Sequence, residues 1–184
     1  AEHIGPAAQR NLDITCVVMD NGVYGLTKGQ ASPTTQFGVM TSSTPFGKLE
    51  AAMKPFEQYL AHGVSFIGSH YSSRPRDLAK LIGAAMDHRG FSIVHVQSPC
   101  TTYNDTFDLL KGNKKLGIAP LVYAIPEDHD PNDKRAAEEI ARAPGVPLGI
   151  IYREECPTLE DLQEDVRKKA RSRTAAEMVE TYSL

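Results

Sequence analysis

Three short apolar runs, separated by stretches with helical periodicity, limit this chain to a small set of folds. Ile14 to Met19 and Phe91 to Val96 are rich in β-forming residues, and Val64 to Ile67 is a shorter run of the same kind. Continuous apolar runs of this length are typical of strands that are buried on both faces, as in a parallel sheet. Strands that alternate with helices favour right-handed βαβ crossovers. We therefore predict an α/β fold with a mostly parallel sheet flanked by helices.

Helical spacing and end signals place two helices between these strands. Lys48 to His62 carries apolar residues at helical intervals, and Gly63 stands where that helix is expected to end. Pro75 opens a second and clearer helix, and Gly90 closes it. The apolar residues of this second helix fall on one face: Leu78, Leu81, Ile82 and Ala85. We expect that face to lie on the sheet.

Beyond about Gly117 the pattern changes, and we divide the chain into residues 1–117 and residues 118–184. The second part holds two short apolar runs and a short helix, followed by a highly charged helix that begins near Thr158. The runs and the short helix are Leu121–Ile125, Leu148–Tyr152 and Asn132–Ala143. We expect residues 118–184 to form a carboxyl-terminal extension that packs on the domain or on a partner subunit.

Charge and composition exclude several classes of protein. Twenty basic against 23 acidic residues give a formal net charge of −3, so no overall field favours nucleic acid or an anionic membrane as a partner. No apolar run approaches the roughly 18 residues that cross a bilayer. The three cysteines, Cys16, Cys100 and Cys156, form no CxxC pair and are too few for a disulfide framework. A reducing, cytoplasmic compartment fits this cysteine usage best.

Two loops are the candidate functional segments, because ligands of open α/β sheets bind beyond the carboxyl ends of the strands. Asn21 to about Pro45 follows the first strand, and Ser98 to Asn104 follows the strand that ends near Val96. We expect both loops to emerge at one edge and to share a site. The Asn21 amide and the carbonyl two residues later are oxygen donors of the kind that Mg²⁺ prefers. An Asn-Gly pair after a strand is also an ordinary turn, and that reading stays open.

The titratable residues taken alone give no catalytic signal. None of the six histidines falls in an HxxxH or HxH spacing. We predict that His95, which alternates within its strand, is a hydrogen-bonded histidine of the sheet rather than a base. A lone cysteine such as Cys100 is most often a small buried apolar residue.

The segment MDNGVYGLTKGQASPTT, residues 19–35, resembles the second half of the thiamine-diphosphate and magnesium motif in the β subunits of 2-oxoacid:ferredoxin oxidoreductases. The similarity continues through FSIVHVQSPCTTYN, residues 91–104. It extends more loosely through EDHDPNDKRAAEEIA and PLGIIYREECPTLEDL, so that it spans nearly the whole chain. The resemblance implies a thiamine-diphosphate-binding fold and a thiamine-dependent oxidative decarboxylation of a 2-oxoacid, 2-oxoglutarate or pyruvate, to acyl-CoA and CO₂. Electrons would pass through a [4Fe–4S] cluster to ferredoxin.

The resemblance also implies how the magnesium ion would be held. Its protein ligands would be the Asn21 side chain, the Val23 carbonyl and the Asp of an upstream GDG motif. No GDG occurs in these 184 residues. Because the retained half of the motif is intact, we expect an amino-terminal portion of the subunit to precede this chain and to supply both GDG and further cysteines.

Four more residues receive roles from the same resemblance. Gly25 would allow a close approach of the backbone to thiamine diphosphate, and Leu26 would lie against the thiazolium and the substrate. Lys28 would offer a cation to a carboxylate or to coenzyme A phosphates. Cys100 would be the fourth thiolate of the [4Fe–4S] cluster, with the other three cysteines upstream.

The expected partners are the α subunit of the same enzyme, ferredoxin, a 2-oxoacid and coenzyme A, which makes the enzyme a heteromer. The charged carboxyl-terminal segment favours the 2-oxoglutarate type slightly over the pyruvate type. Two alternatives remain: a non-oxidative thiamine-dependent decarboxylase or synthase, and a non-catalytic assembly module that lacks the GDG half. The SPCTTYN segment, residues 98–104, argues against the first, because such an enzyme needs no cluster thiolate.

Overall fold

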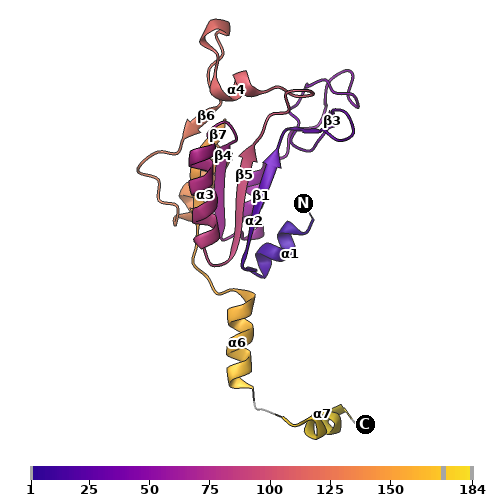
Figure 1. The fold of residues 1–184 in the computed structure, drawn as a ribbon, viewed down its shortest axis with the longest axis vertical. Coiled ribbons are helices and arrows are strands. Elements are labelled where there is room, and N and C mark those ends of the chain that lie inside the picture. The colour runs from indigo at the N-terminus through magenta and orange to yellow at the C-terminus, as the bar shows by residue number, and fades with distance from the viewer. Residues whose placement is uncertain (1, 171–172, 183–184) are drawn as a thin grey trace.

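The computed structural model describes residues 2–170 and 173–182 (Figure 1). The chain enters a central sheet early, leaves it twice for loops at one end, and finishes in two helices beyond the opposite end. The elements are, in order, α1 (Ile4–Gln9), β1 (Ile14–Asp20), β2 (Val23–Tyr24), β3 (Gln30–Ala31), α2 (Pro55–His62), β4 (Phe66–Tyr71), α3 (Pro75–Asp87), β5 (Phe91–Gln97), α4 (Phe107–Lys111), the 3₁₀ helix η1 (Lys114–Leu116), β6 (Val122–Ala124), α5 (Lys134–Arg142), β7 (Val146–Arg153), α6 (Leu159–Lys169) and α7 (Ala175–Tyr182).

The central sheet has five strands in the order β1-β5-β4-β7-β6. β1, β5 and β4 run parallel, and β6 runs parallel to β7, whereas β7 is antiparallel to β4. The predicted α/β fold with a mostly parallel sheet is confirmed. β7 lies antiparallel beside β4, and β6 pairs with β7. In this way two strands from residues 118–184 extend the sheet formed by β1, β5 and β4.

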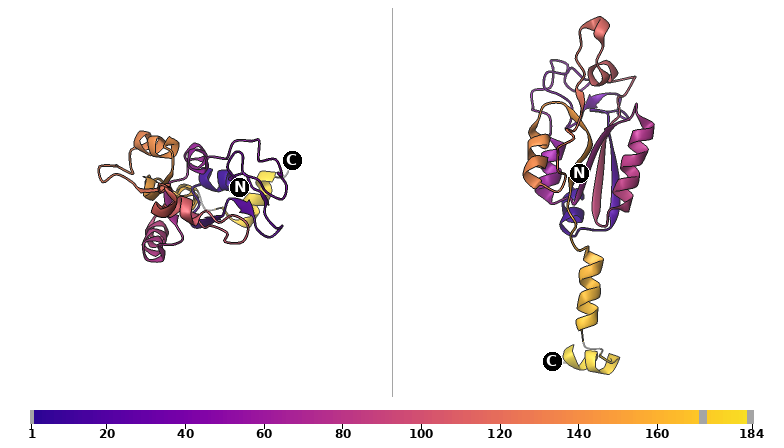
Figure 2. Two further views of the ribbon diagram at one scale, coloured as in Figure 1. Left: turned by 90° about the horizontal axis from the view of Figure 1, so that it is seen from above. Right: turned by 90° about the vertical axis from the view of Figure 1, so that its left-hand side faces the viewer.

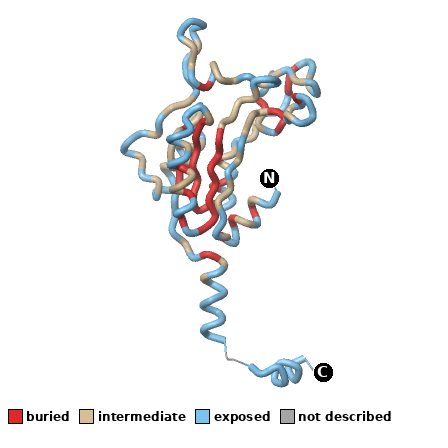
Figure 3. The backbone as a smooth tube through the Cα atoms, viewed as in Figure 1, coloured by how far each residue is buried: buried red, intermediate tan, exposed pale blue. Residues whose placement is uncertain are grey.

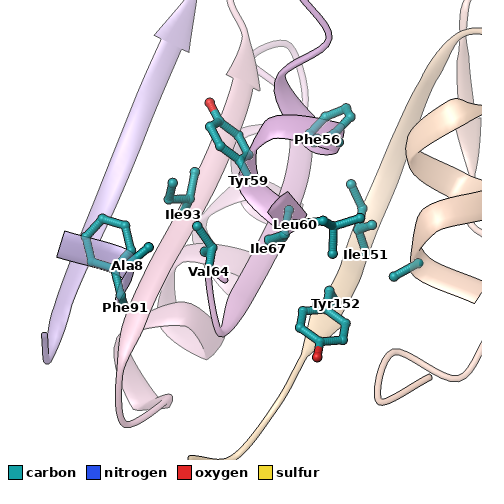
Figure 4. Packing of buried hydrophobic residues seen from close by; sticks show 11 residues of the cluster. Ala8, Phe56, Tyr59, Leu60, Val64, Ile67, Phe91, Ile93, Ile151 and Tyr152 are labelled. Atoms are coloured by element: carbon teal, nitrogen blue, oxygen red, sulfur yellow. The ribbon is translucent and has the colours of Figure 1, made fainter. Parts of the chain in front are cut away.

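Helices cover both faces of the sheet (Figure 2). α3 packs against β4 and β5 on one face through a cluster that includes Phe66, Leu81 and Val94. α1, α2 and α5 lie on the other face, over a larger cluster that includes Leu60, Ile67 and Ile151 (Figure 4). The apolar face predicted for the α3 segment therefore lies on the sheet, as its spacing indicates.

Three expected elements differ from the observed ones. The helix expected from Lys48 begins only at Pro55, because proline fits the first turn of a helix and residues 48–54 instead bond back to the preceding loop. The strand expected at Val64–Ile67 runs from Phe66 to Tyr71. The two-residue strands β2 and β3 pair within the long loop, which therefore has structure of its own.

β1 also differs from its expected environment. Within the described residues, it is the last strand at one side of the sheet and pairs with β5 alone. Its side chains are half-buried or exposed, with Met19 59% exposed, so the expectation of burial on both faces is wrong for the structure described. The apolar sequence of β1 favours a position inside a sheet. In the described chain, however, no strand pairs with the side of β1 that faces away from β5.

The last two helices extend away from the sheet (Figure 3). A capping box starts α6: the Thr158 hydroxyl accepts from the Asp161 N–H, and the Asp161 carboxylate accepts from the Thr158 N–H. Asp161 also pairs with Arg89, which follows α3. No residue of α6 or α7 is buried among the described residues. None of the described helices is long and apolar enough to traverse a bilayer.

Candidate functional site

The two candidate loops meet beyond the carboxyl ends of β1 and β5. The Ser98 N–H donates to the Asp20 carbonyl at 2.7 Å, which extends the pairing of the two strands into the loops. The Asn104 side-chain amide donates to the Asn21 carbonyl at 2.9 Å. The loop that carries Asn21 and the loop that carries Cys100 are therefore in direct contact, as the sheet topology predicts.

Glycines make this contact possible. Gly22 has φ +70°, and a Cβ there would lie 2.8 Å from the Asn104 side-chain nitrogen. Gly29 has φ +83°, and a Cβ there would lie 3.0 Å from the Tyr103 ring. A side chain at either position would strain the backbone and force the loops apart.

Asn21 and Val23 form the turn that the family resemblance links to magnesium. The Val23 N–H donates to the Asn21 side-chain oxygen at 3.0 Å, so the amide is already oriented by its own turn. The Val23 side chain is buried, which holds the backbone of the turn in place. Oxygen donors suit Mg²⁺, but two protein ligands are too few to hold the ion. The described residues also contain no group of three or more His, Cys, Asp or Glu side chains that could hold a metal ion. The turn fits part of a magnesium site that needs further ligands.

Asp20, which the sequence alone does not single out, organises the base of the same loop. One carboxylate oxygen accepts from the Gly22 N–H at 2.9 Å and from the Thr34 hydroxyl at 2.6 Å. The other accepts from His95 Nε2 at 3.3 Å. Burial would raise the pKa of Asp20, but the hydrogen bonds from His95, Thr34 and Gly22 outweigh it and hold the pKa below its ordinary value. The available signal was its place at a strand end, directly before Asn21.

His95 is buried, and its ring is bonded on both sides. Nε2 faces Asp20, and Nδ1 lies 3.0 Å from the Tyr59 hydroxyl. The prediction that His95 is a hydrogen-bonded histidine of the sheet is confirmed. Burial is the main cause that raises the pKa of Tyr59 well above its ordinary value, and the Asp20 charge adds to it.

Lys48 is a second residue whose role the sequence does not reveal. Its ammonium group is buried and donates to the carbonyls of Pro33 and Thr35, at 3.2 and 2.9 Å. The Thr35 hydroxyl in turn donates to the Gly22 carbonyl. Lys48 therefore fixes the far end of the long loop against the turn at Asn21. A lysine in a polar segment is usually solvated, so the sequence carried no sign of this role.

Gly25, Leu26 and Lys28 lie in the outer part of the loop. Leu26 is 98% exposed, and Lys28 is exposed with φ +69°. A Cβ on Gly25 would stand 3.6 Å from the Asn21 side-chain nitrogen, so its backbone lies next to the proposed metal ligand. The predicted contacts of these residues with thiamine diphosphate stay predictions.

Cys100 is partly exposed and free, as are Cys16 and Cys156. Hydrogen bonding from the nearby backbone N–H groups of Tyr103 and Thr102 lowers the pKa of its thiol. Burial raises the pKa of Cys156 instead. Cys100 thus has the environment of a thiolate ligand, although one thiolate cannot hold a [4Fe–4S] cluster.

Two protein-family models match the chain. Residues 1–96 match the C-terminal TPP binding domain of thiamine pyrophosphate enzymes, and residues 100–168 match the C-terminal part of the pyruvate ferredoxin oxidoreductase beta subunit. The first model covers the sheet strands β1, β4 and β5 up to Val96, together with the Asn21 loop. The second begins at Cys100.

Individual proteins give the same result. The chain is 33% identical over 160 residues to the 2-oxoacid:ferredoxin oxidoreductase subunit beta of Saccharolobus solfataricus, covering 83% of this chain and 52% of the relative. It is 32% identical to the 2-oxoglutarate synthase subunit KorB of Archaeoglobus fulgidus, covering 90% of this chain and 59% of that protein. The chain thus spans between half and three-fifths of these two relatives.

A solved structure matches the whole fold. A chain of the 2-oxoglutarate:ferredoxin oxidoreductase from Magnetococcus marinus, determined with 2-oxoglutarate, coenzyme A and succinyl-CoA bound, superposes with a TM-score of 0.88 at 34% identity. The match covers 100% of this chain and 62% of that one.

Proposed function

Because the chain belongs to the β subunits of the 2-oxoacid:ferredoxin oxidoreductases, we propose that it serves the thiamine-dependent oxidative decarboxylation of a 2-oxoacid. The products would be an acyl-CoA, CO₂ and reduced ferredoxin. We favour 2-oxoglutarate as the substrate, because relatives named for that acid and a structure determined with it are among the matches.

The loop turn would serve the cofactor. When bound, thiamine diphosphate supplies the nucleophilic carbon and the electron sink that decarboxylation of a 2-oxoacid requires. Asn21 and Val23 would give two oxygen ligands to the Mg²⁺ ion on its diphosphate, and Gly25 would let the backbone approach. Leu26 would exclude water near the reacting carbon, and the Lys28 ammonium would attract a substrate carboxylate or a coenzyme A phosphate.

The second loop would serve electron transfer. Cys100, with its lowered pKa, would bind a [4Fe–4S] cluster as a thiolate together with three cysteines that this chain lacks. We propose that those cysteines and the GDG motif lie in an amino-terminal part of the same subunit. A cytoplasmic heteromer with an α subunit follows from the same proposal.

The two final helices would take part in that assembly. α6 and α7 expose apolar side chains that include Leu162, Val166 and Val179. We propose that this part of residues 118–184 packs on the partner subunit.

The observation that carries the proposal is the hydrogen bond between Asn104 and the Asn21 carbonyl. It joins the loop with the proposed metal ligand to the loop with the proposed cluster thiolate. A non-oxidative thiamine enzyme has no use for a thiolate at this place, so the contact favours the oxidative reaction.

The test is an assay of the assembled enzyme with Asn21→Ala beside the wild type. We expect 2-oxoglutarate- and coenzyme A-dependent reduction of ferredoxin by the wild type, and weaker Mg²⁺-dependent binding of thiamine diphosphate by the variant. Asn132→Ala, in a distant exposed turn, is the control. Equal cofactor binding by Asn21→Ala would contradict the metal role, and a wild type without iron or ferredoxin reduction would contradict the oxidative function.

A further inference from the structure

A buried chain of hydrogen bonds runs from helix α2 to the base of the Asn21 loop. It consists of the Tyr59 hydroxyl, the His95 ring and the Asp20 carboxylate. His95 is 1% exposed, and the Asp20 side chain is 12% exposed. These three side chains therefore lie where burial requires each polar group to have a hydrogen-bond partner.

The strand register brings the central pair together. Asp20 on β1 is opposite Gln97 on β5, and His95 is two residues before Gln97. Residues two apart along a strand point to the same face, so Asp20 and His95 are diagonal neighbours on the side of the sheet that α2 covers. Phe56 and Tyr59 of α2 pack against the imidazole, with ring centroids 5.4 and 6.0 Å from it.

The contact with Asp20 places a proton on one ring nitrogen. An ionised carboxylate only accepts, so His95 Nε2 carries a proton, and in the neutral ring Nδ1 accepts from the Tyr59 hydroxyl. The Gln97 amide lies 3.3 Å from the same Nε2, and its oxygen is the end that fits an N–H there. The neutral ring is thus held in one tautomer, and the bonds on both sides fix its orientation.

The Asp20 carboxylate connects the fixed His95 ring to the Asn21 loop. The oxygen that His95 does not bind accepts from the Gly22 N–H and the Thr34 hydroxyl, on the two sides of the loop. Asn21 lies between Asp20 and Gly22 in the sequence. Any rotation of the Asp20 carboxylate would therefore move the turn that orients Asn21.

We propose that His95, supported by Tyr59, is a positioning residue for the cofactor loop, and that it acts by fixing the Asp20 carboxylate under the Asn21 turn. The inference deepens the proposed function and rests on it, because the position of Asn21 matters to thiamine diphosphate only if the chain binds that cofactor. His95 would not touch cofactor or substrate. Its effect would be on cofactor affinity rather than on the rate of the loaded enzyme.

Two replacements of His95 separate this role from general packing. His95→Asn shortens the side chain and removes the donor to Asp20, whereas His95→Gln places an amide nitrogen near the former Nε2. His70→Asn is the matched control, because His70 is also a buried strand histidine, and its ring bonds to the Tyr71 carbonyl rather than to the loop. Tyr59→Phe removes a single oxygen and keeps the test valid if His95→Asn does not fold.

The first measurement is amide hydrogen exchange of residues 21–35 in the assembled enzyme without thiamine diphosphate and Mg²⁺, so that the result does not depend on the cofactor. We expect His95→Asn to accelerate exchange there by about tenfold or more, as for loss of a hydrogen bond to a charged group. His95→Gln should recover most of the protection, and His70→Asn should leave it unchanged. Tyr59→Phe should have a smaller effect and add little to His95→Asn, because both act on one chain of bonds.

The second measurement is binding and turnover in the assembled enzyme. We expect the apparent dissociation constant of thiamine diphosphate with Mg²⁺ to rise about tenfold in His95→Asn, while the rate at saturating cofactor changes by less than about twofold. Unchanged exchange in His95→Asn, or an equal effect of His70→Asn, would overturn the inference. Failure of the wild type to bind thiamine diphosphate would overturn the proposed function instead, because the exchange experiment does not depend on the cofactor.

Discussion

At the scale of single residues, the three cysteines differ more in their surroundings than in their exposure. Cys100 receives backbone N–H groups, which stabilise its thiolate, whereas burial disfavours the thiolate of Cys156. Only the thiolate reacts readily with alkylating agents. The surroundings therefore favour the thiolate form of Cys100 and disfavour that of Cys156.

We predict that iodoacetamide modifies Cys100 several-fold faster than Cys156 near neutral pH in the cluster-free chain. A lowered pKa gives Cys100 a larger thiolate fraction, and its rate should level off at a lower pH than that of Cys156. Mass spectrometry of peptides after timed labelling between about pH 6 and 9 measures both rates at once. Faster labelling of Cys156 would contradict the electrostatic account of Cys100.

A second prediction at this scale concerns Lys48. Lys48→Met removes two hydrogen bonds from a buried cation and leaves the carbonyls of Pro33 and Thr35 without their partner. We expect the free energy of unfolding to fall by about 1–3 kcal/mol, measured by denaturant titration. Lys54→Met is the control, because the Lys54 side chain makes an exposed pair with Glu57 and its loss should change stability by less than about 1 kcal/mol.

Residue-scale features of the site were only partly predictable from the sequence. The contact between the two loops followed from the rule that loops of parallel strands meet at one edge. The Asp20–His95–Tyr59 chain did not, because its members are separated by 75 and 36 residues and only the strand register and α2 bring them together. Lys48 was missed for a different reason: its partners are backbone carbonyl groups, which carry no sequence signal.

At the scale of elements, apolar spacing and end residues predicted β1, α3 and β5 to within a residue or a few of their bounds. The prediction of α2 was wrong at its start, because apolar residues before Pro55 happen to continue the helical spacing while their backbone bonds to the long loop. Gly63 does end that helix, with φ +77°. Local signals thus placed the end of α2 at Gly63 and the start of α3 at Pro75, but not the start of α2.

We predict that Thr158→Ala weakens α6 without weakening the sheet. The Thr158 hydroxyl caps the first turn, and loss of such a cap costs about 1 kcal/mol. Amide exchange in residues 159–169 should become faster, while exchange in β4 and β5 stays as in the wild type. Equal loss of protection in the sheet would show that α6 and the body unfold together.

The start of α6 should also respond to pH. Hydrogen bonds from Arg89 and Thr158 lower the pKa of Asp161 from its ordinary 3.8. A carboxyl group with a lowered pKa stabilises the folded form above its ordinary value, and the contribution is lost as the pH falls towards the lower folded value. Protection of α6 should therefore decrease below about pH 4, and Asp161→Asn should remove that dependence. A pH response that persists in Asp161→Asn would assign it to another group.

At the scale of the whole molecule, one edge of β1 has no neighbouring strand in the described chain. Strand edges with free N–H and C=O groups pair readily with other strands, and β1 also exposes Ile14 and Met19. We predict that the 184-residue chain alone associates as its concentration rises, measured by light scattering. Val17→Lys, which adds a charge at a partly exposed position of β1, should reduce that association. Monomers at every concentration would contradict the prediction.

The proposed function places different tasks at the two ends of the sheet. The loops with Asn21 and Cys100 lie beyond the carboxyl ends of β1 and β5, whereas α6 and α7 extend from the opposite end (Figure 1). Changes in one region therefore have little reason to disturb the other. If the loops bind the cofactor and the last two helices bind a partner subunit, as proposed, α6 and α7 can drift over evolutionary time to suit a new partner while selection keeps the loops constant. Two lineages with the same chemistry can then come to assemble differently.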